Sequence, residues 1–126
     1  MRHRPVDLSG QTNLGQFVSL LARLNLVICN DGGPLHLAVS QGVKTVSIFG
    51  PVDPRVYGPY PAEPDRHRVI LNEELRCRPC YHQFRLPPCP YERACLTSIS
   101  VDDVLEACEA MLAPPLDVAH ASDLAR

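Results

Sequence analysis

The sequence has no tryptophan, a single lysine and no strong excess of charge of either sign. Its 12 Lys and Arg residues face 14 Asp and Glu residues, which gives a formal net charge of -2. This balance excludes the broad basic surface that binds nucleic-acid backbones, so no nucleic-acid partner is predicted. The 126 residues are enough for one small domain, and too few for an enzyme whose site lies between two domains.

Long apolar runs are also missing. The longest, residues 17–29, is interrupted by Ser19, Arg23 and Asn25 and is too short to span a bilayer. No apolar signal-peptide core follows the basic residues 2–4. These features predict a soluble cytoplasmic protein, in which the six cysteines stay reduced or hold a metal ion.

The first half of the chain carries clear periodic patterns. Apolar residues at positions 14, 17, 18 and 21 have the spacing of an amphipathic helix, and Asn13 with Gln16 forms a capping-box-like start. The run at residues 26–29 predicts a buried strand that ends in the loop 30–33. Pro34 is a favourable first residue for the next helix, and residues 45–49 predict a second strand. This alternation is typical of half a doubly wound α/β sheet, a partial Rossmann-like parallel sheet with flanking helices.

The second half is rich in proline and cysteine. Nine of the 13 prolines lie between residues 51 and 90, which predicts a Cys/Pro-rich insertion over about residues 51–97. A further strand is expected at residues 69–71, and a last helix begins at Ser100. The chain is therefore interpreted as one domain over residues 1–113 followed by a loose tail, residues 114–126.

The most informative segment joins the first strand to the second helix. Here Gly32 and Gly33 let the backbone approach an anion closely, and the first turn of the helix directs N–H groups at it. This arrangement predicts a diphosphate site in which His36 adds a hydrogen bond and Asp31 binds sugar hydroxyls or caps the helix. The alternative interpretation is a simple tight turn with His36 facing the core or solvent, and the spacing alone does not decide between them.

Four cysteines form the second candidate site. Cys77, Cys80, Cys89 and Cys95 include one Cys-x2-Cys pair, as structural zinc sites do, but the second pair is spaced more widely than usual. Three interpretations remain open: a structural zinc ion, reduced thiols that pack a proline-rich loop, or a redox-labile disulfide. A catalytic thiol is not expected, because the nearby His82 has no orienting carboxylate close to it in the sequence.

A few other residues invite a functional interpretation. Cys29 and Cys108 lie in apolar runs and are predicted to be small core residues. His67 has no local partner and is expected to be solvated. Tyrosines close to arginines suggest stacking on the bases of single-stranded nucleic acid, but the sequence shows no positive groove for the backbone. These tyrosines are Tyr57, Tyr60, Tyr81 and Tyr91.

Residues 31–38 read Asp-Gly-Gly-Pro-Leu-His-Leu-Ala, residues 42–43 read Gly-Val, and residues 48–54 read Ile-Phe-Gly-Pro-Val-Asp-Pro. Together with residues 7–14 and the Cys-Arg-Pro-Cys at residues 77–80, these motifs resemble the C-terminal half of glycosyltransferase family 9. That family comprises the ADP-heptose:lipopolysaccharide heptosyltransferases. The resemblance runs in one order from the first of these motifs to the end of the last predicted helix.

The resemblance implies half of a GT-B enzyme, in which two Rossmann-like domains face a cleft and the C-terminal one holds the nucleotide-sugar donor. It implies an ADP-heptose-like donor, a lipopolysaccharide-type acceptor and a place at the inner face of the cytoplasmic membrane, with at most peripheral membrane contact. Transfer would be a direct displacement that needs no metal cofactor. The acceptor domain and general base of such enzymes lie in the N-terminal half, so no catalytic residue is expected in this chain. It would be inactive alone, and a separate N-terminal half is a candidate partner.

Carried over residue by residue, the family's donor-binding pattern falls on Asp31, Gly32, Gly33 and His36. Gly32 stands where the family usually has Thr or Ser, so one hydroxyl contact to the donor is missing. The loop after the second strand is expected at the cleft rim, although a proline-stiffened connector with a solvated carboxylate explains it nearly as well. The expected rim residues are Gly50, Pro51 and Asp53.

Two hypotheses compete with a donor-binding domain. The first is a small four-cysteine zinc-binding module that contacts other macromolecules, with the α/β part as a scaffold. The second is a truncated remnant that binds no ligand. Three observations separate these hypotheses. A donor-binding domain binds ADP with or without metal, a zinc module loses its fold on chelation, and a truncated remnant is partly disordered.

Overall fold

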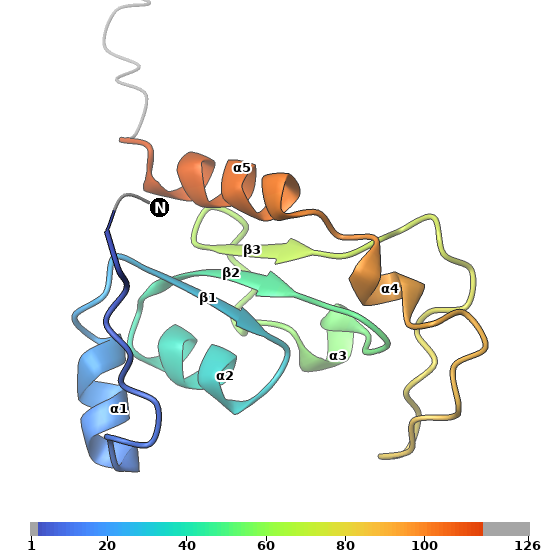
Figure 1. Cartoon of the computed structure of the whole chain (residues 1–126), viewed down its shortest axis with the longest axis horizontal. Helices are drawn as coiled ribbons and strands as arrows, with labels where there is room; N and C mark the ends of the chain where they lie inside the picture. The colour runs from blue at the N-terminus through green and yellow to red at the C-terminus, as the bar shows by residue number, and fades with distance from the viewer. Residues whose placement is uncertain (1–2, 115–126) are drawn as a thin grey trace, which may run out of the picture.

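The computed structural model describes residues 3–114 as an α/β fold built on three parallel strands. They are β1 (Leu26–Asn30), β2 (Lys44–Ile48) and β3 (His67–Ile70), arranged in the order β1-β2-β3 (Figure 1). In the register of the sheet, Asn30 of β1 lies opposite Ile48 of β2, so the carboxyl ends of these strands meet at one edge. The predicted parallel α/β class is therefore confirmed.

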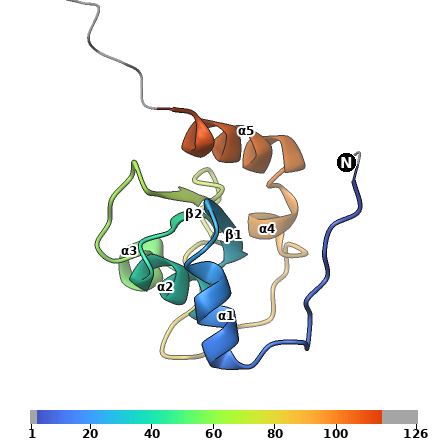
Figure 2. The same ribbon diagram turned by 90° about the vertical axis from the view of Figure 1, so that its left-hand side faces the viewer.

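Five helices surround the sheet within residues 3–114. Helices α1 (Leu14–Leu21) and α2 (Gly33–Ser40) lie on one side, and α5 (Val101–Leu112) lies across the other (Figures 1 and 2). The short helices α3 (Pro54–Tyr57) and α4 (Ala94–Thr97) lie beyond the carboxyl ends of the strands. In this part of the chain, no helix is long and apolar enough to cross a membrane.

The ends of the longer helices follow from local chemistry. The Asn13 side chain accepts a hydrogen bond from the Gln16 N–H, and the Gln16 side chain accepts one from the Asn13 N–H, as predicted. Ser100 and Asp103 form the same reciprocal pair at the start of α5. The carboxyl end of α5 is held by Lys44, whose Nζ donates to the Met111 carbonyl oxygen at 2.7 Å. A positive charge at the carboxyl end of a helix interacts favourably with the helix dipole.

Three apolar clusters hold the layers together. The first joins α1 and α2 to the sheet, the second lies below the carboxyl ends of the strands, and the third lies under α5. Fully burying a large apolar side chain contributes about 1.5 to 3 kcal/mol, so these contacts dominate the stability of the fold. The buried members are Leu21, Val27, Ala38 and Val43 in the first cluster, Leu35, Phe49 and Val52 in the second, and Val46, Cys108 and Met111 in the third.

The strand expected at residues 69–71 is present as β3, which begins two residues earlier and pairs with β2. Two expectations about burial need correction. His67 on β3 is buried rather than solvated, because it faces Thr45 on the neighbouring strand, with His67 Nδ1 and Thr45 Oγ1 hydrogen-bonded at 3.0 Å. Ile28 is 55% exposed, although its apolar strand was predicted to be buried. Of the expected tail, residues 115–126 lie outside the described residues.

Candidate functional site

A hollow of about 350 Å³ lies beyond the carboxyl ends of β1 and β2. Ligands of open parallel sheets bind at this edge, because the loops there are free of the sheet and the following helices point their N-termini at it. The hollow brings together three of the four predicted donor-binding residues with one predicted rim residue. Its lining residues are Asp31, Gly32, His36, Pro51, Val52, Tyr57, Tyr81 and Leu86.

The turn into α2 has the conformation that a close backbone approach requires. Gly32 has a φ of +151°, a region that side-chain-bearing residues rarely adopt. Gly33 has an ordinary φ, and a Cβ added to it would meet no atom within 4 Å. The two glycines therefore have different roles. Gly32 allows the backbone to make the turn, and Gly33 leaves open space in front of the helix.

Helix α2 begins without a side-chain cap. Asp31 therefore does not cap it, which leaves sugar hydroxyls as the predicted partner of this carboxylate. The Asp31 backbone N–H instead donates to the Ile48 carbonyl oxygen at 3.3 Å and ties the loop to the end of β2. His36, one turn into the helix, is exposed and lines the hollow. The side chains of Asp31 and His36 are thus both available to a ligand at the helix N-terminus.

The other lining residues of the hollow are mostly apolar and aromatic, and we call Val52, Tyr57, Tyr81 and Leu86 the aromatic wall. Tyr57 and Tyr81 pack edge to face, with ring centroids 5.8 Å apart and an interplanar angle of 72°. Val52 and Leu86 complete this wall. Sequence reasoning missed these four residues as site residues. Tyr57 and Val52 lie close to the rim motif, but no sequence signal identifies Tyr81 or Leu86, which come from a distant loop.

That distant loop is attached to the segment after β2 by hydrogen bonds to the backbone carbonyl oxygens of residues 50–52. The Arg78 guanidinium donates to the carbonyl oxygens of Gly50, at 2.8 Å, and Val52, at 3.2 Å. The backbone N–H groups of Cys80 and Tyr81 both donate to the Pro51 carbonyl oxygen. The Cys-Arg-Pro-Cys motif therefore positions the Tyr81 ring against the hollow.

The three predicted rim residues have separate roles. Pro51 lines the hollow, whereas Gly50 is buried and a Cβ there would lie 2.7 Å from the Leu96 side chain. Asp53 caps α3 through the Arg55 N–H and forms an ion pair with the Arg55 side chain at 2.8 Å. These hydrogen bonds from Arg55 hold the pKa of the Asp53 carboxyl below its usual value. Gly50 and Asp53 therefore shape the loop from outside the hollow.

The four clustered cysteines lie on the loop that follows β3 and on α4. Among residues 3–114 there is no group of three His, Cys, Asp or Glu side chains that could hold a metal ion. The Cys89 Sγ instead accepts a hydrogen bond from the Arg93 N–H, and Cys77 is exposed. Burial raises the pKa of the Cys95 thiol, and the neighbouring Cys80 acts in the same direction. Cys89 and Cys77 also raise this pKa, so the four thiols lie near one another, and all four are free thiols in the structure.

Cys29 lies just before the candidate site and is half-buried. Burial, followed by the negative charge of Asp31, raises the pKa of its thiol. The thiolate is the reactive form of cysteine, so a raised pKa makes this side chain a poor nucleophile. Its contacts with two apolar clusters agree with the predicted packing role.

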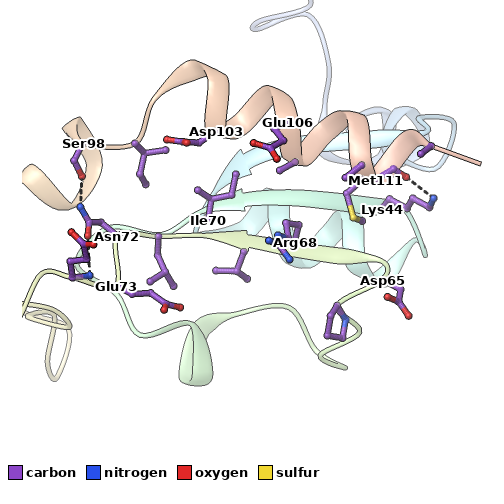
Figure 3. A pocket seen from close by; sticks show the side chains of 18 of the residues that line it. Lys44, Asp65, Arg68, Ile70, Asn72, Glu73, Ser98, Asp103, Glu106 and Met111 are labelled. Atoms are coloured by element: carbon purple, nitrogen blue, oxygen red, sulfur yellow. Dashed lines mark hydrogen bonds between the residues drawn. The ribbon is translucent and has the colours of Figure 1, made fainter.

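A larger groove, of about 1290 Å³, runs between α5 and the outer edge of β3 (Figure 3). Its walls carry charges of both signs, including Lys44, Arg68, Asp103 and Glu106. The polar contacts drawn there join Asn72 to Ser98 and Lys44 to the Met111 carbonyl oxygen, and both hold parts of the fold together. The groove contains no predicted site residue, so the smaller hollow is the candidate site.

Comparison with known proteins gives a consistent result. Residues 1–89 match glycosyltransferase family 9 (heptosyltransferase). The chain is 29% identical over 107 residues to "Lipooligosaccharide heptosyltransferase 2" of Campylobacter jejuni, a match that covers 84% of this chain and 31% of that protein. It is 28% identical over 118 residues to "Lipopolysaccharide heptosyltransferase 1" of Pseudomonas aeruginosa, covering 82% of this chain and 31% of that protein. The chain thus spans about a third of the length of these relatives, and no solved structure matches it significantly.

Proposed function

The chain belongs to glycosyltransferase family 9, a family of enzymes, and on that premise we propose that residues 3–114 form a donor-binding domain for an ADP-sugar. One observation carries the proposal: Asp31, Gly32 and His36 line one hollow at the uncapped N-terminus of α2. The relatives are named for heptose transfer, so the proposed sugar is a heptose. The zinc-binding module is not proposed as a second function, because residues 3–114 place no three metal-ligating side chains together.

The diphosphate is proposed to bind in front of Gly33. The open space there lets phosphate oxygens reach the first turn of α2, where the helix dipole favours negative charge. His36 adds a hydrogen bond to the same phosphates or to a sugar hydroxyl. The Asp31 carboxylate would repel phosphate, so it is assigned to sugar hydroxyls.

The tyrosines of the aromatic wall are proposed to bind the sugar of the donor. Tyr57 and Tyr81 line the same hollow as His36, and the apolar face of a sugar ring can pack on such aromatic surface. Gly32 supplies no hydroxyl where the resemblance expects Thr or Ser, so the aromatic wall is proposed to hold the sugar in place of that contact.

The proposed reaction is a direct displacement with inversion. An acceptor hydroxyl oxygen forms a bond to the anomeric carbon while the bond from that carbon to the diphosphate oxygen breaks, and ADP leaves with the electron pair. The N-terminus of α2 stabilises the charge that develops on the leaving diphosphate, which is why no metal cofactor is proposed. The proton of the acceptor passes to a base that lies outside this chain.

Calorimetric titration of ADP tests the site. Replacing Gly33→Val fills the space in front of the helix and is expected to abolish ADP binding. Replacing His36→Ala removes one charge-assisted contact of roughly 1 to 3 kcal/mol and should weaken binding by about ten- to a hundred-fold. Gly15→Ala at the start of α1 is the matched control, because it adds a methyl group at a helix N-terminus far from the hollow.

Circular dichroism must first show that each variant is folded. The proposal fails if folded Gly33→Val binds ADP as tightly as the parent, since the loop is then only a turn. It also fails if Gly15→Ala weakens binding as much as Gly33→Val, since the effect is then unrelated to the site.

The acceptor is proposed to be a lipopolysaccharide-type sugar at the inner face of the cytoplasmic membrane. The chain spans about a third of its relatives, so its remaining partner is proposed to be the rest of the fold, supplied in the same or another polypeptide. The chain by itself is therefore expected to transfer no sugar. Release of ADP from an ADP-heptose by the purified chain, above a blank without protein, would contradict this expectation.

A further inference from the structure

The loop between β3 and α4 extends away from the sheet, past α3 and α4 (Figure 1). Every residue from 82 to 93 in this loop is exposed. His82 and Arg85 form an antiparallel bridge, in which each backbone N–H donates to the carbonyl oxygen of the other, at 3.1 and 2.9 Å. Gln83 and Phe84 therefore form a tight two-residue turn between them. We call residues 82–86 the loop tip.

The backbone of this turn has a conformation that side-chain-bearing residues rarely adopt. Gln83 has a φ of +48° and Phe84 a φ of +60°. Two-residue turns with positive φ at both positions usually carry Asn and Gly, because a bulky side chain is strained there. Phe84 is 84% exposed and belongs to none of the three apolar clusters of residues 3–114. Its ring therefore contributes little to the fold, and a strained residue of this kind points to a functional contact.

The side chains of the loop tip lie on two faces. Along a hairpin, successive side chains alternate between faces, and directly opposite residues share one face. Tyr81 and Leu86 line the hollow of the candidate donor site. His82 and Arg85, which are their neighbours in the sequence, therefore lie on the other face. Phe84 stands between the two faces, at the apex of the turn.

Positive charge is concentrated in this part of the chain. Residues 76–93 contain four arginines and one carboxylate, Glu92, whereas the whole chain has a net charge of -2. The remainder of the chain is therefore acidic. The ion pairs found in residues 3–114 involve Arg55 and Arg66, so the exposed guanidinium of Arg85 is available to another partner.

We propose that the loop tip docks on the surface of an anionic phospholipid bilayer. The ring of Phe84 would insert below the headgroups, and Arg85 with His82 would lie at the level of the lipid phosphates. A bilayer fits because a single ring at the apex of a convex turn offers no groove to a folded partner, whereas it can enter between lipids. Charge favours the same orientation, since the acidic remainder of the chain is repelled by anionic lipid.

This inference goes beyond the proposed function and rests on it in one respect. Leu86 belongs to the loop tip and also lines the hollow. Docking would therefore hold the candidate donor site close to the membrane surface, where the proposed acceptor lies.

Tryptophan fluorescence tests the proposal, because the chain contains no tryptophan of its own. Phe84→Trp places one reporter at the loop tip, and Val101→Trp places one at the start of α5, where Val101 is 82% exposed. The probes are vesicles of phosphatidylcholine, with and without phosphatidylglycerol. With the anionic vesicles, the emission of Phe84→Trp should shift to shorter wavelength and be quenched by lipids brominated on their acyl chains. The emission of Val101→Trp should not change.

Co-sedimentation with the same vesicles measures binding without a tryptophan. Phe84→Ser should lower the partition coefficient about ten-fold, and Arg85→Gln about five-fold. The matched controls are Val101→Ser and Arg23→Gln, which change an exposed apolar residue and an exposed arginine outside the loop. Raising the salt concentration should release the parent chain, because salt screens the attraction between arginine and lipid phosphate. All four positions are exposed, so the Tm of each variant should stay close to that of the parent.

The proposal is overturned if the emission of Phe84→Trp is the same with and without anionic vesicles, or if Val101→Trp responds equally. It is also overturned if Arg23→Gln lowers binding as much as Arg85→Gln, or if neutral vesicles bind the chain as well as anionic ones. A short emission wavelength already present without vesicles would show that a second copy of the chain covers Phe84 instead. ADP titration is a separate readout: vesicle binding without ADP binding refutes only the donor site, and ADP binding without vesicle binding refutes only the docking.

Discussion

The guanidinium of Arg78 donates a hydrogen bond to the carbonyl oxygen of Gly50, 28 residues earlier in the chain, over 2.8 Å. This contact joins the loop that carries Tyr81 to the segment that follows β2, next to Pro51 in the lining of the candidate site. A second hydrogen bond, to the Val52 carbonyl oxygen, fixes the orientation of the planar group. The shape of the hollow thus depends on a side chain that does not line it.

Replacing Arg78→Lys should lower stability and weaken ADP binding together. Lysine keeps the charge, but its ammonium group cannot reproduce the planar fork that reaches both carbonyl oxygens. Losing a hydrogen bond from a charged group costs about 1.5 to 3 kcal/mol, which corresponds to a Tm decrease of several degrees in a domain of this size. Arg68→Lys on the exposed face of β3 is the control, and an equal decrease there would contradict the role given to Arg78.

His67 should make the fold sensitive to mild acid. Burial, followed by the charge of Arg66, lowers its pKa below the ordinary value of 6.5. The unfolded chain therefore takes up the proton more readily, so stability is full above pH 6.5 and is lost as the pH falls below that value. His67→Gln, which cannot titrate, should show a smaller fall in Tm between about pH 7.5 and 5.5. Parallel Tm curves for parent and variant would show that His67 does not contribute.

Gly32 and Gly33 should respond differently to the same added methyl group. Gly32→Ala forces a side chain into a φ of +151°, which costs on the order of 1 to 3 kcal/mol and lowers the Tm. Gly33→Ala meets open space and should leave the Tm nearly unchanged while weakening ADP binding. Thermal unfolding of both variants checks this order, and a larger loss of stability at Gly33 would show that the turn is different in solution.

Chelation of zinc should leave the fold unchanged. The described cysteines form no ligand set, so the Tm is expected to be the same with and without EDTA. Cys95 is buried, and Cys95→Ala should be destabilising through lost packing, whereas Cys77→Ala at an exposed position should have little effect. The zinc-binding module would be supported if the purified chain contained one equivalent of zinc and lost its structure when that zinc was removed.

Much of the local structure is determined by residues that are close together in the sequence. The Asn13–Gln16 and Ser100–Asp103 pairs fix two helix starts, because each capping contact spans three residues. The apolar runs and the glycine turn also predict the order of strand, loop and helix around Asp31. The predicted donor loop depends only on this order, which is why the sequence could place it at the end of a strand.

The tertiary structure decided what surrounds that loop. Tyr81 lines the hollow because Arg78 and the Tyr81 backbone N–H donate hydrogen bonds to residues 50–52. These contacts join segments about thirty residues apart, and no local sequence pattern predicts them. His67 is buried because β3 pairs with β2 at Thr45, and Ile28 stays exposed on β1, which pairs on one side only within residues 3–114. Short-range spacing specifies which element forms, whereas burial and site walls arise from long-range packing, whose partners can be identified only once the sheet is assembled.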